Sequence, residues 1–298
     1  MKVGELGEDQ IVATLIEGLA SSQQVLVGPG DDCAVIEAPE GLILLKTDAV
    51  VEGIHFLSEE NPKRVGWKAV ARVLSDFAAM GGVPKELLVT LAISKSSSVA
   101  WVKELYEGMA SCLKKHGGVI VGGETTSIPD GSPAMISIAG KGQVQREHLV
   151  TRSGGVVGDG IYVTGHLGGS LAGHHLDFNP RIEQAAWLVE NVKPSAMMDL
   201  SDGLAKDLPR LAKMSGCGFQ LQLDALPCRE GCSLENALGD GEDYELLFTS
   251  ESHSELIKGW RRVFPRVRLT KIGELVLEEG QSISGGWDHF RAEDSSLE

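Results

Sequence analysis

The chain has 298 residues, which is long for one domain and suits two. Apolar residues make up 42% of it and charged residues 23%, as in ordinary folded proteins. The formal net charge of −15 argues against non-specific nucleic-acid binding, which depends on lysine and arginine. No apolar run reaches the ~18 residues of a membrane span, and the N-terminus lacks the apolar core of a signal peptide. We therefore expect a cytoplasmic protein without nucleic-acid or membrane partners.

Hydrophobic periodicity in the first half predicts alternating helices and strands. We expect helices over 8–20, 62–80 and 99–116, and strands over 33–37, 42–46, 86–94, 119–121 and 134–144. A polar, glycine-rich stretch over 145–159 has no such periodicity. We place a domain boundary there, near residue 150.

The second half starts again with a strand. We expect strands over 161–164, 196–200, 218–223, 244–249 and 267–276, and helices over 202–215 and 252–262. Pro209 lies inside the helix expected over 202–215. It should either kink this helix or move its first residue further along the chain. Because helices and strands alternate in both halves, the sequence predicts an α/β or α+β fold with domains over 1–150 and 151–298.

Short acidic clusters flanked by glycine are the main functional signal. Five aspartates fall in three of them, namely Asp31 with Asp32, Asp48 after Thr47, and Asp199 with Asp202. Carboxylates this close repel one another unless a cation neutralises them, and Mg²⁺ binds carboxylates together with substrate phosphates. The clusters therefore predict a magnesium-phosphate site. Taken singly, they are also typical of surface turns, and Asp202 or Ser201 could be a helix N-cap.

Asp76 supports this interpretation from a helical pattern. Val65, Val73 and Met80 share one face of the helix expected over 62–80. Asp76 falls in the middle of that apolar face. A carboxylate buried there is costly unless it is paired or bound to metal. We therefore expect either an ion pair with lysine or arginine or a metal ligand.

Two glycine-rich turns are candidates for contacts with phosphate. Gly122-Gly123-Glu124 follows a strand expected to be buried and puts an acid beside a backbone that can approach a ligand closely. The turn over 165–170 leads from a strand into a helix, whose free N–H groups favour phosphate. No P-loop and no protein-kinase signature is present, so a nucleotide must be bound by other means.

In this order the motifs resemble the thiamine-monophosphate kinase family, which belongs to the ATP-dependent superfamily of aminoimidazole ribonucleotide synthetase. The matching segments span nearly the whole chain: 30–34, 47–56, 74–81, 122–126, 151–154, 198–204, 241–246 and 286–290. Val-Glu-Gly-Ile-His-Phe at 51–56 separates this family from its cousins. Two positions depart from the pattern, because Glu124 replaces the usual Asp and Val73 a frequent Asn.

The resemblance implies transfer of the ATP γ-phosphoryl group directly to thiamine monophosphate, giving thiamine diphosphate. It implies two α/β domains, with the N-terminal sheet pairing across a homodimer and active sites at the subunit interface. Several Mg²⁺ ions are implied, and a need for K⁺ is left open. The alternatives are another ATP-dependent enzyme of the superfamily, such as the ribonucleotide cyclase, and a non-catalytic nucleotide-binding relative.

The site residues implied by the resemblance fall into three groups. The metal ligands would be Asp32, Thr47, Asp48, Asp76, Glu124, Asp199 and Asp202. ATP would contact Gly123, Glu124, Arg152 and Ser201, and thiamine monophosphate would contact His55, Glu242 and Trp287. No covalent nucleophile is expected, because the attacking phosphate oxygen is already anionic.

Overall fold

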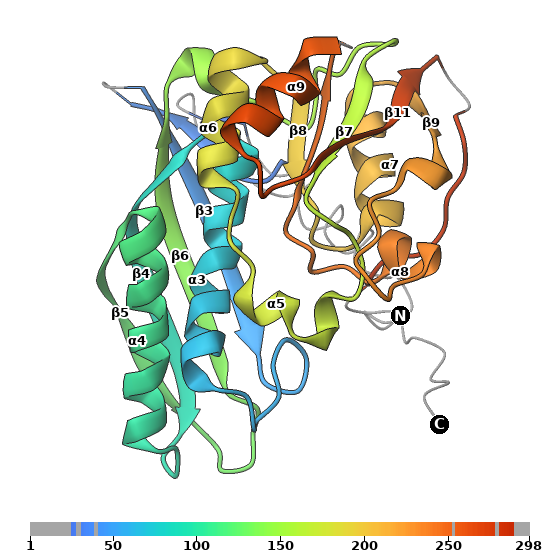
Figure 1. The fold of residues 1–298 in the computed structure, drawn as a ribbon. Helices are drawn as coiled ribbons and strands as arrows, with labels where there is room; N and C mark the ends of the chain where they lie inside the picture. Colours follow the sequence, from blue (N-terminus) through green and yellow to red (C-terminus); the bar gives the residue numbers. More distant parts are fainter. Residues whose placement is uncertain (1–24, 28–30, 39–40, 252–253, 278–279, 289–298) are drawn as a thin grey trace, which may run out of the picture.

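The computed structural model describes residues 25–27, 31–38, 41–251, 254–277 and 280–288 (Figure 1). The helix predicted over 8–20 lies outside these ranges. Each half of the chain builds one sheet, and α3 (Pro62–Ala79) packs against strands of both. No helix among the described residues is long and apolar enough to cross a membrane.

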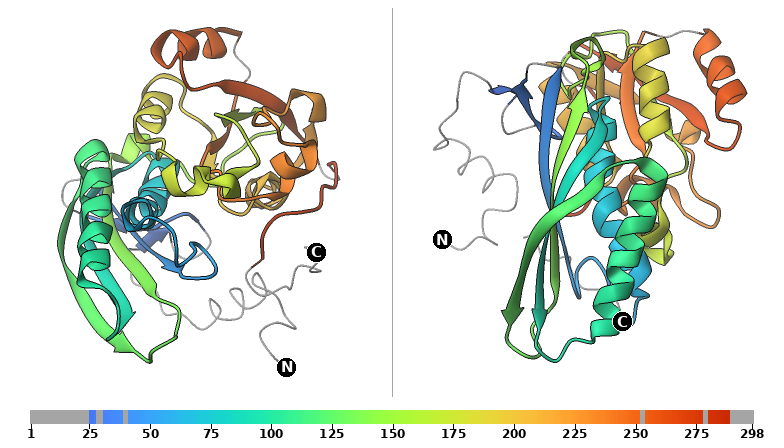
Figure 2. Two further views of the ribbon diagram at one scale, coloured as in Figure 1. Left: turned by 60° about the horizontal axis from the view of Figure 1, so that its bottom comes forward. Right: turned by 90° about the vertical axis from the view of Figure 1, so that its left-hand side faces the viewer.

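The first sheet has six strands in the order β1-β2-β3-β6-β4-β5. Neighbouring strands are antiparallel except β4 and β5, which are parallel and joined through the helix α4. α3 and α4 cover one face of this sheet, and no described helix covers the other (Figure 2). The bounds are β1 Val25–Val27, β2 Ala34–Glu37, β3 Leu42–Val51, β4 Val83–Ser94, α4 Val99–His116, β5 Val119–Ile128 and β6 Met135–Val144.

The second sheet has five strands in the order β8-β10-β7-β11-β9, all antiparallel. Its strands are β7 Gly160–Thr164, β8 Ala196–Asp199, β9 Gly218–Leu221, β10 Leu246–Ser250 and β11 Leu269–Val276. Its helices are α5 His174–Asp177, α6 Ile182–Asn191, α7 Leu204–Met214, α8 Leu234–Gly239 and α9 Ser254–Val263. Short 3₁₀ turns lie over 146–148, 170–172 and 223–225. The mainly antiparallel pairing makes the fold α+β, one of the two predicted classes.

The start of α3 follows from its sequence. Asn61 precedes the helix, and its side chain accepts a hydrogen bond from the backbone N–H of Lys63. Pro62 occupies the first turn, where its missing N–H costs nothing. The apolar face that the sequence predicted is buried, with Asp76 in it. This prediction is confirmed, and α3 is the central helix of the molecule.

Two strands are longer than the sequence predicted. β3 continues to Val51, so Asp48 lies inside the strand instead of at its end. β5 continues to Ile128 and forms an exposed edge of the sheet, so the prediction of a short buried strand there is wrong. Val119 and Val121 of β5 are 57% and 58% exposed. Period-two alternation could not distinguish this exposed apolar face from a buried one.

Candidate active site

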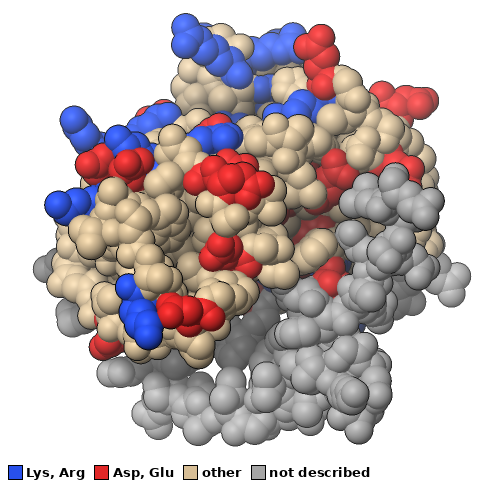
Figure 3. Space-filling model, turned by 90° about the horizontal axis from the view of Figure 1, so that it is seen from below, with Lys and Arg blue, Asp and Glu red and all other residues tan. Residues whose placement is uncertain are grey.

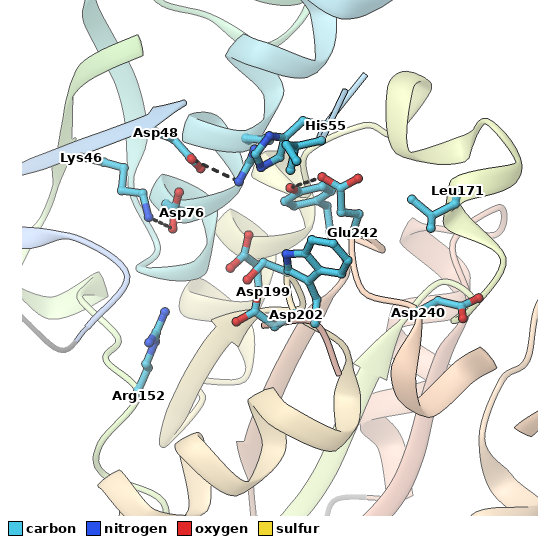
Figure 4. Close-up of a pocket in the computed structure, with 15 residues that line it drawn as sticks. Lys46, Asp48, His55, Asp76, Arg152, Leu171, Asp199, Asp202, Asp240 and Glu242 are labelled. Atoms are coloured by element: carbon cyan, nitrogen blue, oxygen red, sulfur yellow. Dashed lines mark hydrogen bonds and ion pairs between the residues drawn. The ribbon is translucent and has the colours of Figure 1, made fainter. Parts of the chain in front are cut away.

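A cavity of about 380 Å³ lies where β3 and α3 meet the loops of the second half (Figure 4). Most of the predicted site residues line it, namely Asp48, His55, Asp76, Arg152, Asp199, Ser201, Asp202, Glu242 and Trp287. The other lining residues include Lys46, Arg72, Asp240 and Tyr244. The fold therefore gathers side chains that lie up to 241 positions apart in the sequence, from Lys46 to Trp287.

Three buried carboxylates meet beside the cavity, which Asp76 and Asp199 line and Asp32 does not. Asp32 precedes β2, Asp76 lies near the end of α3, and Asp199 ends β8. One carboxylate oxygen of each lies within 4.8 Å of the others. This set of hard oxygen donors fits Mg²⁺, which binds carboxylates and fills the rest of its shell with water and phosphate.

Two basic side chains balance these acids in the protein alone. Lys46 Nζ lies 2.9 Å from Asp76 Oδ1, and Arg152 donates to both oxygens of Asp32 at 2.8 and 3.0 Å. Burial and the charge of Asp32 raise the pKa of Asp199 to about 7. Burial also raises the pKa of Asp76 well above its ordinary value, although Lys46 opposes the shift. The carboxyl groups therefore favour extra positive charge, which a divalent cation would supply.

Asp48 reaches the cavity from β3. Its carboxylate lies 3.1 Å from Arg72 Nη2, and Lys46, two positions earlier, points to the same side. Arg72 also donates to the carbonyl oxygen of Ala49 at 2.9 Å. Asp199 accepts a hydrogen bond from the hydroxyl of Ser75, and Asp202 accepts one from Arg210. Each predicted metal ligand that lines the cavity therefore has a cation or a hydrogen-bond donor of the chain beside it.

The loop carrying Ser201 and Asp202 is held by an acid that sequence reasoning missed. Asp207 accepts hydrogen bonds from the backbone N–H groups of Ser201 and Asp202 at 3.0 and 2.9 Å. Burial and the charge of Asp202 raise the pKa of Asp207 to about 8. Gly203, which has no side chain, is the N-cap of α7, so the alternative of Asp202 or Ser201 as the cap is wrong. An acid in the first helical turn was the only signal for Asp207.

Of the three predicted substrate contacts, His55 and Glu242 lie close together in the cavity (Figure 4), whereas Trp287 is attached to the loop of Asp202. His55 Nδ1 accepts from the N–H of Val51 at 3.1 Å, so a neutral ring carries its proton on Nε2. Glu242 is hydrogen-bonded to the ammonium of Lys68 at 2.7 Å. The backbone N–H of Trp287 donates to the carbonyl of Asp202 at 2.8 Å, tying the chain near its C-terminal end to the cavity.

Thr47, Gly123 and Glu124 do not line this cavity. Thr47 alternates with Asp48 along β3 and belongs to a shallow surface with Leu88 and Val121 on the uncovered face of the sheet. Glu124 is exposed on the edge strand β5. A Cβ on Gly123 would meet Val89 O at 1.9 Å, so strand packing alone requires glycine there.

The glycine turn over 165–170 does not offer its N–H groups to a phosphate. Gly168 N donates to the carboxylate of Asp243 at 3.0 Å, and Gly169 N donates to Asp240 at 2.6 Å. The turn leads into a 3₁₀ turn over 170–172, not into a long helix. The phosphate-binding hypothesis for this turn is wrong, because side chains of the chain itself occupy the donors.

The acidic character of the chain extends to its surface. On the face shown in Figure 3, acidic side chains lie near the middle of the described surface, and many lysines and arginines lie towards its rim. A polyphosphate would meet unfavourable charge here unless cations accompany it.

Comparison with known proteins first defines the class. The N-terminal domain of AIR synthase related proteins matches residues 30–144, and the C-terminal domain of the same group matches residues 156–258. Thiamine-monophosphate kinase from Rhodopirellula baltica is 38% identical over 86% of this chain and 85% of its own length. The enzyme of that name from Aquifex aeolicus is 32% identical over 97% of this chain and 100% of its own.

Solved structures agree with these sequence matches. The structure of AaThiL complexed with AMPPCP and TMP superposes with a TM-score of 0.84 at 30% identity, covering 97% of this chain and 99% of the other. The chain belongs to the thiamine-monophosphate kinase family, whose members are phosphotransferases.

Proposed function

We propose that the protein phosphorylates thiamine monophosphate with ATP, giving thiamine diphosphate and ADP. The observation that carries this proposal is one cavity lined by Asp76 and Asp199, which meet the buried Asp32, and also by His55 and Glu242. The structural neighbour AaThiL was solved with AMPPCP and TMP, which supports the same pair of substrate classes here.

Several Mg²⁺ ions fit the acidic end. Asp32, Asp76 and Asp199 supply a compact set of buried oxygens, and Asp48 and Asp202 extend it along the cavity wall. When bound, the ions would neutralise the polyphosphate and the charge that develops in the transition state. Arg152 and Ser201 line the same region and would contact ATP. A requirement for K⁺ stays open.

Phosphoryl transfer in this cavity depends on positioning. An oxygen of the thiamine monophosphate phosphate attacks the γ-phosphorus, a new P–O bond forms opposite the bond to the β-phosphate oxygen, and ADP leaves with that electron pair. The attacking oxygen is already anionic, so no protein base is needed. His55, Glu242 and Trp287 would hold the thiamine part, His55 as an Nε2–H donor and Glu242 as an acceptor.

We also propose that two copies of the chain pair through the uncovered face of the first sheet. That face exposes Leu45, Leu88, Val119 and Val121, and apolar patches of this kind mark interaction surfaces. Glu124 lies on the same sheet, away from its own chain's cavity. Pairing would let Gly123 and Glu124 act at the cavity of the partner subunit, and Thr47 would lie at the interface.

The proposal places the protein in the cytoplasm. All five cysteines are free thiols, as is usual in a reducing compartment.

The direct test incubates the protein with ATP, Mg²⁺ and thiamine monophosphate and measures thiamine diphosphate and ADP by chromatography. We expect equal amounts of the two products and none when Mg²⁺ is removed by a chelator. A folded protein that forms no thiamine diphosphate would overturn the proposal. ADP release with aminoimidazole-type ribonucleotides in place of thiamine monophosphate would instead favour the alternative of another enzyme of the superfamily. Nucleotide binding without turnover of any acceptor would indicate the non-catalytic alternative.

A further inference from the structure

Lys68 is a lysine buried inside the molecule beside the cavity. Its side chain has no exposed surface and extends from α3. Its ammonium donates to the carbonyl oxygen of His55 at 2.6 Å and to Glu242 Oε2 at 2.7 Å. One cation therefore joins two segments that lie 187 positions apart in the sequence.

The first segment is the turn after β3 that carries His55. The N–H groups of Ile54 and His55 donate to Val51 O at 3.2 and 2.8 Å, and Gly53 N donates to Phe56 O at 2.8 Å. These bonds fix the shape of the turn but not its position over the cavity. The bond from Lys68 Nζ attaches the turn to α3.

The second segment carries Glu242 in an unusual backbone conformation. Glu242 and Tyr244 have φ angles of +52° and +50°, which cost energy for residues with a side chain. Backbone bonds from Glu242 N to Ser201 O and from Tyr244 N to Leu200 O, at 2.7 and 2.8 Å, hold the segment in place. Strain of this kind persists where the surroundings enforce it, and it is common at binding sites.

Both oxygens of the Glu242 carboxylate have hydrogen-bond partners within the protein. Oε2 accepts from Lys68, and Oε1 lies 3.4 Å from the hydroxyl of Tyr244, whose ring stacks on Phe178 at 4.0 Å between centroids. Burial lowers the pKa of Lys68 to about 8, and the charge of Glu242 opposes that shift. A buried ammonium is costly, so a simpler apolar residue would serve if packing were its only role.

We propose that Lys68 is a positioning residue for the thiamine end of the cavity, holding the His55 turn and the Glu242 carboxylate at a fixed separation. The proposal rests on the proposed function. Lys68 itself is buried and does not line the cavity, so it would not touch a substrate bound there. Its effect is therefore on recognition of thiamine monophosphate and not on ATP, which binds at the acidic end.

The test compares steady-state kinetics of the wild type with Lys68→Gln, Lys68→Arg, Glu242→Gln and the double variant Lys68→Gln/Glu242→Gln. We expect Lys68→Gln to raise KM for thiamine monophosphate by about tenfold and to leave KM for ATP within about twofold. Lys68→Arg keeps the charge and should recover part of the loss. In the Glu242→Gln background, Lys68→Gln should add much less, because the two residues act together.

Lys63→Met is the matched control, since Lys63 lies on the same helix and pairs with Glu107 at the surface. It should change neither KM. If Lys68→Gln does not fold, the Lys68→Arg and Glu242→Gln pair still gives the KM comparison. Equal changes in both KM values, or full additivity with Glu242→Gln, would overturn the positioning role. A wild type without turnover would overturn the proposed function, and this inference with it.

Discussion

The interdomain cavity and the uncovered face of the first sheet contrast sharply, although adjacent residues of β3 contribute to both. Asp48 points into the cavity, whereas Thr47 points to the outer face. The cavity collects buried acids from both halves of one chain, each beside a cation or donor. The outer face has exposed apolar residues and, on its edge strand, Glu124. One chain therefore gathers most of the proposed site residues around one cavity, and in the proposed dimer a second copy would supply Gly123 and Glu124.

The largest expected effect tests the cavity. Asp48→Asn should lower kcat by roughly 10²–10³-fold, because it removes a proposed ligand of the Mg²⁺ ions that would stabilise the transition state. The melting temperature should change little, because the amide oxygen still accepts from Arg72. Asp177→Asn is the control, since Asp177 also pairs with an arginine, Arg64, but is exposed and outside the cavity. Activity near that of the wild type would exclude Asp48 as a metal ligand.

The next effect tests the outer face. Leu88→Glu places a charge in the apolar patch and should convert a dimer to monomers in light scattering, with about a tenfold or greater loss of activity. Val263→Glu is matched in exposure, at 49% against 48% for Leu88, but lies on α9 of the other half. An active Leu88→Glu monomer would show that one chain suffices.

A smaller effect asks whether Glu124 acts across the interface. Glu124→Gln and Asp48→Asn are each expected to be impaired in homodimers. A mixed dimer contains one cavity with both native acids, so mixing equal amounts of the two variants after dissociation should restore about a quarter of wild-type activity. Activity equal to the mean of the two separate variants would place Glu124 outside the site of the partner subunit.

The smallest effect concerns pH and metal. The pKa of Asp199 is raised to about 7 in the folded protein, so between about pH 4 and pH 7 the folded state binds more protons than the unfolded chain. Stability without metal should therefore fall as pH rises through this window. Calorimetry should show a smaller fall with Mg²⁺ than with a chelator at equal ionic strength. Equal slopes would argue against a metal at these carboxylates.

Local patterns predicted much of this architecture. The face of α3 with Asp76 follows from a 3.6-residue period, and the start at Pro62 follows from helix-capping chemistry. Lys68 and Asp207 were missed because their roles depend on partners and loops that only the tertiary fold brings together. The full length of β5 was missed because its apolar residues are exposed, whereas periodicity was interpreted as burial.

Lys68, Arg72 and Asp76 follow one another along α3 at intervals of four residues, and Arg72 and Asp76 line the cavity while Lys68 is buried beside it. Eight residues of helix rise about 12 Å, and a helix resists stretching far more than a loop does. If thiamine monophosphate binds as proposed, the helix sets the distance between the residues that hold its thiamine part and the acidic cluster. In a phosphorylated molecule of another length, the phosphate would lie short of the reacting position or beyond it. The length of the acceptor would then contribute to substrate selection.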